Sequence, residues 1–128
     1  MARAADTNVI VRLIARDDAR QLALALASAA SGLWVSHVVL LEVVWVLESV
    51  YGRAQADIAI AIELLLNHPD ITIQDPDVVR AAVDQLRRHR GIDFTDCLIL
   101  EVARKAGQVP LITFDRALGK LDGVERLS

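Results

Sequence analysis

The fold class of this chain is decided by the stretch LWVSHVVLLEVVWVL at residues 33–47. Its first three residues form a short β-like run, and Ser36 is a favoured residue for capping a helix that we expect to extend to about Tyr51. A short strand that leads directly into a capped helix is typical of an α/β protein. Glu42 is the one charged residue in the apolar part of this helix.

The same alternation of strand and helix extends in both directions from this stretch. A short strand at Ala4-Ala5 precedes a helix that opens at about Asp6, and residues 22–41 predict a helix, a turn and a strand. Further along, we expect helices over 54–66, 76–88 and 95–106, a short helix from about 115, and strands over 71–73, 111–113 and 124–127. Helix-length crossovers between strands predict a largely parallel sheet. We therefore expect one α/β domain over residues 1–128, a three-layer α/β/α sandwich with about five short strands.

The composition indicates a globular, cytoplasmic protein. Of the 128 residues, 54% are hydrophobic, which is enough to bury a core without a disulfide. The single cysteine, Cys97, excludes an internal disulfide and favours a reducing compartment, with a packed thiol as the simpler interpretation and a reactive one as the alternative. The uncharged residues 22–41 are long enough to span a bilayer, but Ser31-Gly32 interrupts them, so we expect no membrane partner.

Four aspartates fall where strands end or helices begin. Asp6 and Asp115 each follow a short strand and precede a helix, and Asp93 and Asp96 stand at a helix start after Gly91. In a parallel sheet, ligands bind at the carboxyl ends of the strands. Aspartate is also a favoured helix cap, so each of these residues taken alone has a purely structural explanation.

Glu42 favours the functional interpretation of these acids. It lies too far inside its helix to be a cap, and at helical spacing its neighbours are apolar. They are Val38, Val39, Trp45 and Val46. A carboxylate on an apolar stripe is costly unless an arginine or a metal compensates it. Because carboxylates without a histidine or cysteine partner favour hard cations, a cluster of Asp6, Glu42, Asp96 and Asp115 predicts a Mg²⁺ or Mn²⁺ site.

These pieces, in this order, resemble the PIN-domain family, and specifically the VapC-type toxins of bacterial toxin–antitoxin pairs. The matching segments are DTNVIVR at 6–12, the helix LLEVVWVL at 40–47, DFTD at 93–96 and LITFD at 111–115. The resemblance implies an endoribonuclease that uses one or two Mg²⁺ or Mn²⁺ ions, cleaves RNA and is neutralised by a cognate antitoxin. It departs from the usual pattern in the first strand, which is Arg3-Ala4-Ala5 rather than strongly hydrophobic, and at Cys97.

The resemblance also implies roles for individual residues. Asp6, Glu42, Asp96 and Asp115 match the metal-binding, catalytic acids of the family. Three further residues match accessory positions: Asp93 before the third acid, Thr113 near the fourth, and Asn8 after the first. Asp93 could equally be a helix cap.

The charge balance permits an RNA partner. The net charge is −3, but removing the four candidate ligands from 17 acids leaves 13 against 14 basic residues, of which twelve are arginine. Arginine suits bidentate phosphate binding. The run Arg87-Arg88-His89-Arg90 is the densest basic group, although it is also what a solvated helix end looks like.

Other function classes match less well. A dehalogenase-like phosphatase needs an acid where Asn8 stands, and a receiver domain needs paired acids after the first strand. The alternative of another class is a PIN-fold module that binds RNA or protein without cleavage. The apolar residues near 22–26 and 58–66 exceed what a small core needs, which predicts an antitoxin groove and a homodimer face, or simply a helix-rich core.

Overall fold

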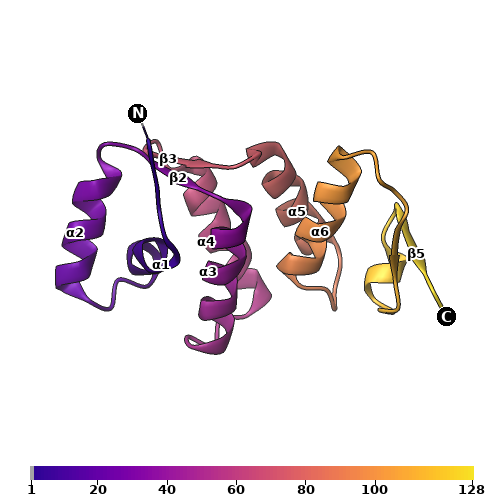
Figure 1. Cartoon of the computed structure of the whole chain (residues 1–128). Coiled ribbons are helices and arrows are strands. Elements are labelled where there is room, and N and C mark those ends of the chain that lie inside the picture. Colours follow the sequence, from indigo (N-terminus) through magenta and orange to yellow (C-terminus); the bar gives the residue numbers. More distant parts are fainter. Residues whose placement is uncertain (1) are drawn as a thin grey trace. The chain divides into compact units, whose positions relative to one another are not determined.

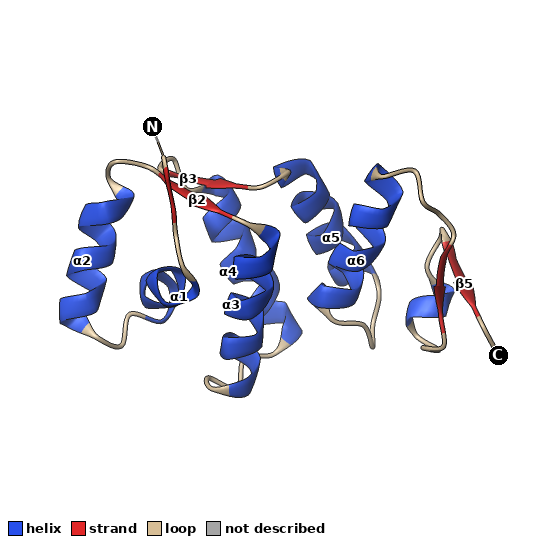
Figure 2. Cartoon of the chain, in the orientation of Figure 1, coloured by secondary structure: helices blue, strands red, loops and turns tan. Residues whose placement is uncertain are grey.

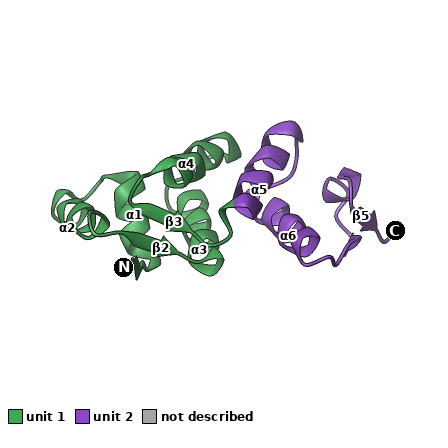
Figure 3. Ribbon diagram, turned by 90° about the horizontal axis from the view of Figure 1, so that it is seen from above, with its two compact units in different colours: residues 1–76 green, residues 77–128 purple. Residues whose placement is uncertain are grey.

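The computed structural model describes residues 2–128 (Figure 1). Their internal contacts divide the chain into two compact units, one up to Pro76 and the other from Asp77 to Ser128 (Figure 3). Each unit is described by itself below, and the predicted single domain over 1–128 stays a prediction. Within the described residues, no helix has both the length and the apolar character needed to cross a membrane.

The first unit is a three-stranded parallel sheet with four helices (Figure 2). Its sheet has the order β1-β2-β3, with Arg3 opposite Leu33 and Leu33 opposite Ile71. Helix α1 packs against α2 and α3, and α4 packs against β3. In chain order the elements are β1 (Arg3–Ala4), α1 (Thr7–Ala15), α2 (Ala19–Ala29), β2 (Leu33–Val35), α3 (His37–Ser49), α4 (Gln55–Asn67) and β3 (Ile71–Ile73).

Local sequence signals account for where these helices begin. The Ser36 side chain accepts a hydrogen bond from the Val39 amide at 3.1 Å, which caps α3 as predicted. Asp18 caps α2 in the same way, through the Gln21 amide at 2.9 Å. The core of the unit is aliphatic. Its fully buried side chains are Ile10, Val11, Val35, Leu40, Val43, Val44, Leu47, Ile58 and Ile62.

The second unit combines two long helices with a two-stranded parallel sheet. Its elements are α5 (Pro76–Arg88), α6 (Phe94–Lys105), β4 (Leu111–Thr113), the 3-10 helix η1 (Leu118–Lys120) and β5 (Val124–Arg126). Leu111 lies opposite Val124 in the β4–β5 register. Phe94, Leu98 and Leu100 of α6 are buried, as are Leu118 and Leu121 around η1.

The predicted α/β class with parallel strands is confirmed, but the strand pairing differs from the prediction. We expected one sheet of about five strands, whereas the largest sheet among the described residues has three, and β4 and β5 pair separately. Each strand has only two or three residues. Such short strands make few ladder hydrogen bonds, so their sequences mark their existence without specifying their partners.

Candidate functional site

Asp6 is placed at the start of α1 by its capping role. Its backbone is extended, and its Oδ1 accepts a hydrogen bond from the Thr7 amide at 2.8 Å. The side chain is exposed, and the cap uses one of its two carboxylate oxygens. Capping and ligand binding are therefore compatible at this position.

Thr7 connects the first two candidate acids. Its hydroxyl group, at Oγ1, donates a hydrogen bond to Glu42 Oε2 over 3.1 Å, across from α1 to α3. Thr7 is only 7% exposed, so this is a buried hydroxyl that holds a surface carboxylate. The bond brings Glu42 to the N-terminus of α1, next to Asp6. Thr7 was not among the site residues predicted from the sequence, and the only signal in the sequence for a role in the site is its position directly after Asp6.

The structure contradicts the reason that we gave for singling out Glu42. Val38 and Trp45, expected to share a buried stripe with it, are 69% and 64% exposed, and Glu42 is exposed as well. Because α3 is apolar almost all round, its sequence does not mark which face is buried. The buried face instead carries Leu40, Val43, Val44 and Leu47. The contact with Thr7, not desolvation, is what associates Glu42 with the site.

In the second unit, Asp93 and Asp96 lie in the N-terminal turn of α6. Asp93 is the N-cap, and its Oδ1 accepts from the Asp96 amide at 2.9 Å. The cap interpretation of Asp93 is thereby confirmed. Asp96 is itself half-buried in the first turn of the helix.

Asp115 follows β4 and organises the turn into η1. Its Oδ2 accepts from the Leu118 amide at 2.7 Å, and its own amide donates to Thr113 Oγ1 at 3.0 Å. Thr113, predicted as an accessory residue, therefore supports the backbone of Asp115. The carboxylate of Asp115 is exposed, with its second oxygen outside the cap.

Asp93, Asp96 and Asp115, the three candidate acids of the second unit, interact electrostatically. Burial raises the pKa of Asp96, and the negative charges of Asp93 and Asp115, together with a hydrogen bond to Asp93, raise it further. A proton or a cation would relieve this repulsion.

The four predicted ligands are divided between the two units. Asp6 and Glu42 belong to the first, and Asp96 and Asp115 to the second. Within residues 2–128, no three His, Cys, Asp or Glu side chains form a group that could hold a metal ion. The four-carboxylate centre therefore stays a prediction.

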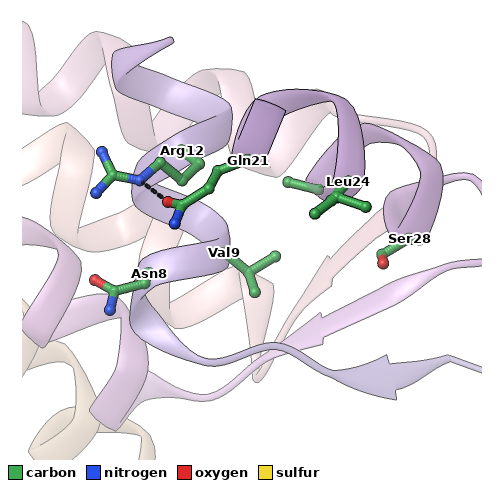
Figure 4. A pocket seen from close by; sticks show the side chains of 7 residues that line it. Asn8, Val9, Arg12, Gln21, Leu24 and Ser28 are labelled. Atoms are coloured by element: carbon green, nitrogen blue, oxygen red, sulfur yellow. Dashed lines mark hydrogen bonds between the residues drawn. The ribbon is translucent and has the colours of Figure 1, made fainter. Parts of the chain in front are cut away.

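Asn8, predicted as an accessory residue, lines a pocket between α1 and α2 (Figure 4). The pocket has a volume of about 270 Å³. Arg12 lies at one end, where its Nε donates to Gln21 Oε1 at 2.6 Å. The remaining lining residues are Val9, Leu24, Ala25 and Ser28.

The three histidines contact backbone groups, and Cys97 is packed, as the simpler interpretation of the sequence predicted. The His37 ring contacts the Gln74 carbonyl oxygen at 2.6 Å, and the His89 ring contacts the Gln85 carbonyl oxygen at 3.1 Å. His68 accepts from the Asp70 amide. Cys97 is fully buried, and burial, followed by nearby acids, raises its pKa to about 12, so the thiol is unreactive at neutral pH.

Comparison with known families agrees with this arrangement. The PIN domain matches residues 4–124, which include every candidate acid. A comparison with curated proteins found no match. The match covers nearly the whole chain. The chain belongs to the PIN-domain family.

Proposed function

We propose that this chain is a Mg²⁺- or Mn²⁺-dependent endoribonuclease that acts as a VapC-type toxin and is neutralised by a cognate antitoxin. PIN domains are generally metal-dependent nucleases. The observation that carries the proposal is the PIN-domain match over residues 4–124, which includes all four candidate acids. A nuclease of this kind needs carboxylates that bind a divalent cation beside a phosphodiester.

The donor set fits a hard divalent cation. Asp6, Glu42, Asp96 and Asp115 would hold it, and they offer only carboxylate oxygens, which Mg²⁺ and Mn²⁺ prefer. When bound, the ion supplies an acidified water and neutralises charge on the phosphoryl oxygens. Thr7 orients Glu42, and the capping bonds of Asp6 and Asp115 restrict their carboxylates. Such restraint lowers the cost of forming the site.

Two arginines near Asp115 are suited to hold RNA phosphates. Arg90 and Arg116 are both exposed, and neither forms an ion pair with any residue in 2–128. Their loops are in contact, because a Cβ on Gly91 would lie 3.7 Å from the Cβ of Ala117. Arg116 directly follows Asp115 in the chain. Guanidinium groups beside the acids would bind phosphates that flank the cleaved bond.

Exposed apolar side chains support protein partners. Leu24 on α2, Trp45 on α3 and Leu64 on α4 are each at least 60% exposed. Exposed large apolar residues on several helices of one small unit favour interaction surfaces. We propose that an antitoxin segment and a second copy of the chain use them.

The nuclease proposal is tested with purified protein, a labelled structured RNA and Mn²⁺. Wild-type protein should cleave, leaving 5′-phosphate ends, and EDTA should stop the reaction. Asp96→Asn and Asp6→Asn should each slow cleavage by about 10³-fold, because metal stabilisation of the transition state is worth several kcal/mol. Asp57→Asn, at an exposed position of α4, is the matched control and should cleave normally. Folded variants that cleave at the wild-type rate would exclude these carboxylates from the site.

Metal binding separates the nuclease from a PIN-fold module that only binds. Calorimetric titration with Mn²⁺ should show uptake by the wild type and a large loss of affinity in Asp96→Asn. Absence of uptake together with RNA binding would favour the binding module instead.

The toxin role is tested separately in cells. Induced expression should arrest growth and create new 5′-phosphate RNA ends, and co-expression of a short DNA-binding protein encoded directly upstream should prevent both. Growth unaffected by an active enzyme would contradict the toxin assignment while leaving the nuclease intact.

A further inference from the structure

A chain of polar contacts, which begins at a buried carboxylate and ends at an exposed arginine, connects α6 to the turn before β5. Glu101 of α6 is only 7% exposed, and its Oε2 accepts from the Gln85 side chain at 3.2 Å. Its Oε1 forms an ion pair with Arg104 Nε at 3.2 Å. Arg104 Nη2 then donates to the backbone carbonyl oxygen of Asp122 at 2.9 Å. Both carboxylate oxygens of a buried acid are thus satisfied, and the guanidinium extends the chain to the backbone.

The guanidinium of Arg104 also packs directly on Gly123. A Cβ at Gly123 would lie 3.0 Å from Nη1 and 3.2 Å from Nη2, so a larger residue would require the guanidinium to shift by a few tenths of an ångström. Gly123 also has a φ of +83°, which glycine adopts readily. The Gly123 carbonyl accepts from the Leu111 amide, the first residue of β4, at 2.9 Å. Arg104 therefore contacts the turn that aligns β4 with β5.

The position of this contact along α6 gives it a consequence for the acids. Asp96 lies in the first turn of α6 and Arg104 in the last. The segment from β4 to β5 includes Asp115, whose charge acts on Asp96, and it is attached to Arg104 at Asp122. Helix α6 therefore carries Asp96 at one end and the attachment to this segment at the other.

We propose that Arg104 is a positioning residue: by anchoring the Asp122-Gly123 turn to Glu101, it holds the β4–β5 segment so that Asp115 stays beside Asp96. Its importance for catalysis rests on the proposed nuclease function, but the positioning itself does not. Loss of the anchor should loosen Asp115 without unfolding α6.

Amide hydrogen exchange tests the positioning directly. In Arg104→Gln, the Leu118 amide, which donates to Asp115 Oδ2, and the Leu111 amide should exchange about tenfold faster or more, the size expected for losing a charged hydrogen bond. The Asp96 amide, held by Asp93, should keep its wild-type rate. Lys105→Gln is the matched control, because Lys105 is the next residue and pairs with exposed Asp77. It should leave all three rates unchanged.

The affinity for Mn²⁺ is a second measurement, which should not change if Arg104 only stabilises the fold. Arg104→Gln, folded by circular dichroism, should bind Mn²⁺ about tenfold more weakly and show a lower kcat with an unchanged KM for RNA. Glu101→Gln should change exchange in the same direction by a smaller factor. Unchanged exchange at Leu118 in Arg104→Gln would overturn the proposal. Wild-type protein that neither binds Mn²⁺ nor cleaves RNA would overturn the proposed function, and the exchange rates would still decide the positioning.

Discussion

The two units hold their carboxylates in different ways. In the first, Asp6 and Glu42 are both exposed and are connected through Thr7, whose amide donates to Asp6 and whose buried hydroxyl donates to Glu42. In the second, Asp93 and Asp115 act on half-buried Asp96, whose pKa is raised. The carboxylates of Asp6 and Glu42 thus accept hydrogen bonds from Thr7, whereas the charged form of Asp96 is disfavoured by burial and by the like charges of Asp93 and Asp115.

The two units also differ in net charge, because the first is acidic and the second is slightly basic. Residues 1–76 carry nine acids and five basic residues, whereas residues 77–128 carry eight acids and nine basic residues. The second unit thus combines a local acid group with a basic surround. This is the pattern expected of a site that binds a cation and a polyanion together. Under the proposed function, the second unit would make most of the contacts with RNA, and the first would contribute oriented ligands.

Among the variants that test this difference between the units, the largest expected change in cleavage rate is at Thr7. Thr7→Val removes the hydroxyl that orients Glu42 but keeps the shape, so we expect cleavage to slow about 10- to 100-fold, as for other residues that orient metal ligands. Stability should fall by about 1 kcal/mol, the net contribution of one hydrogen bond. Cleavage rates and urea unfolding measure the two effects. Thr7→Ser, which keeps the hydroxyl, should retain activity, and an equally inactive serine variant would show that Thr7 acts through packing.

A smaller effect is expected at the arginines. Arg90→Gln and Arg116→Gln should each weaken RNA binding by about tenfold at low salt and reduce the slope of log affinity against log salt by about one, because each removes a phosphate contact. Arg20→Gln, on α2 of the first unit, is the matched control. Binding measured by fluorescence anisotropy over a salt series gives the slope. Equal losses at Arg20 would contradict the assignment of RNA contacts to the second unit.

The smallest effects are on stability, where neighbouring acids should respond in opposite directions. Asp93→Ala removes the α6 cap and should cost about 1 kcal/mol. Asp96→Asn should increase stability at neutral pH by less than about 1 kcal/mol, because the folded state raises the pKa of Asp96 and so disfavours its charged form. Urea unfolding in EDTA measures both.

The pH dependence of the stability difference between wild type and Asp96→Asn also tests the raised pKa of Asp96. Above its raised folded-state pKa, the charged carboxylate lowers wild-type stability relative to Asp96→Asn. As the pH falls through that pKa toward the ordinary value, the wild-type group binds its proton in the folded state first, and the difference should shrink. A difference that grows on acidification would show that Asp96 is stabilised as the anion.

The sequence by itself determined the local elements and the family. Caps at Ser36 and Asp93 and the proline at Pro76 act on the adjacent backbone, so the helices that they start could be predicted to within about a residue. The candidate aspartates follow from their places at strand ends and helix starts, and the PIN-domain match covers them and Glu42. These are short-range signals that a linear sequence carries directly.

Only the tertiary structure decided the contacts between elements. It showed that the face of α3 bearing Glu42 is exposed, that Thr7 reaches Glu42, and that Arg104 reaches the turn at Gly123. An all-round apolar helix has no periodic mark for its buried side, and two- or three-residue strands do not encode their partners. Such choices are made by packing among residues far apart in the chain, which is why the sequence did not reveal that the face of α3 bearing Glu42 is exposed.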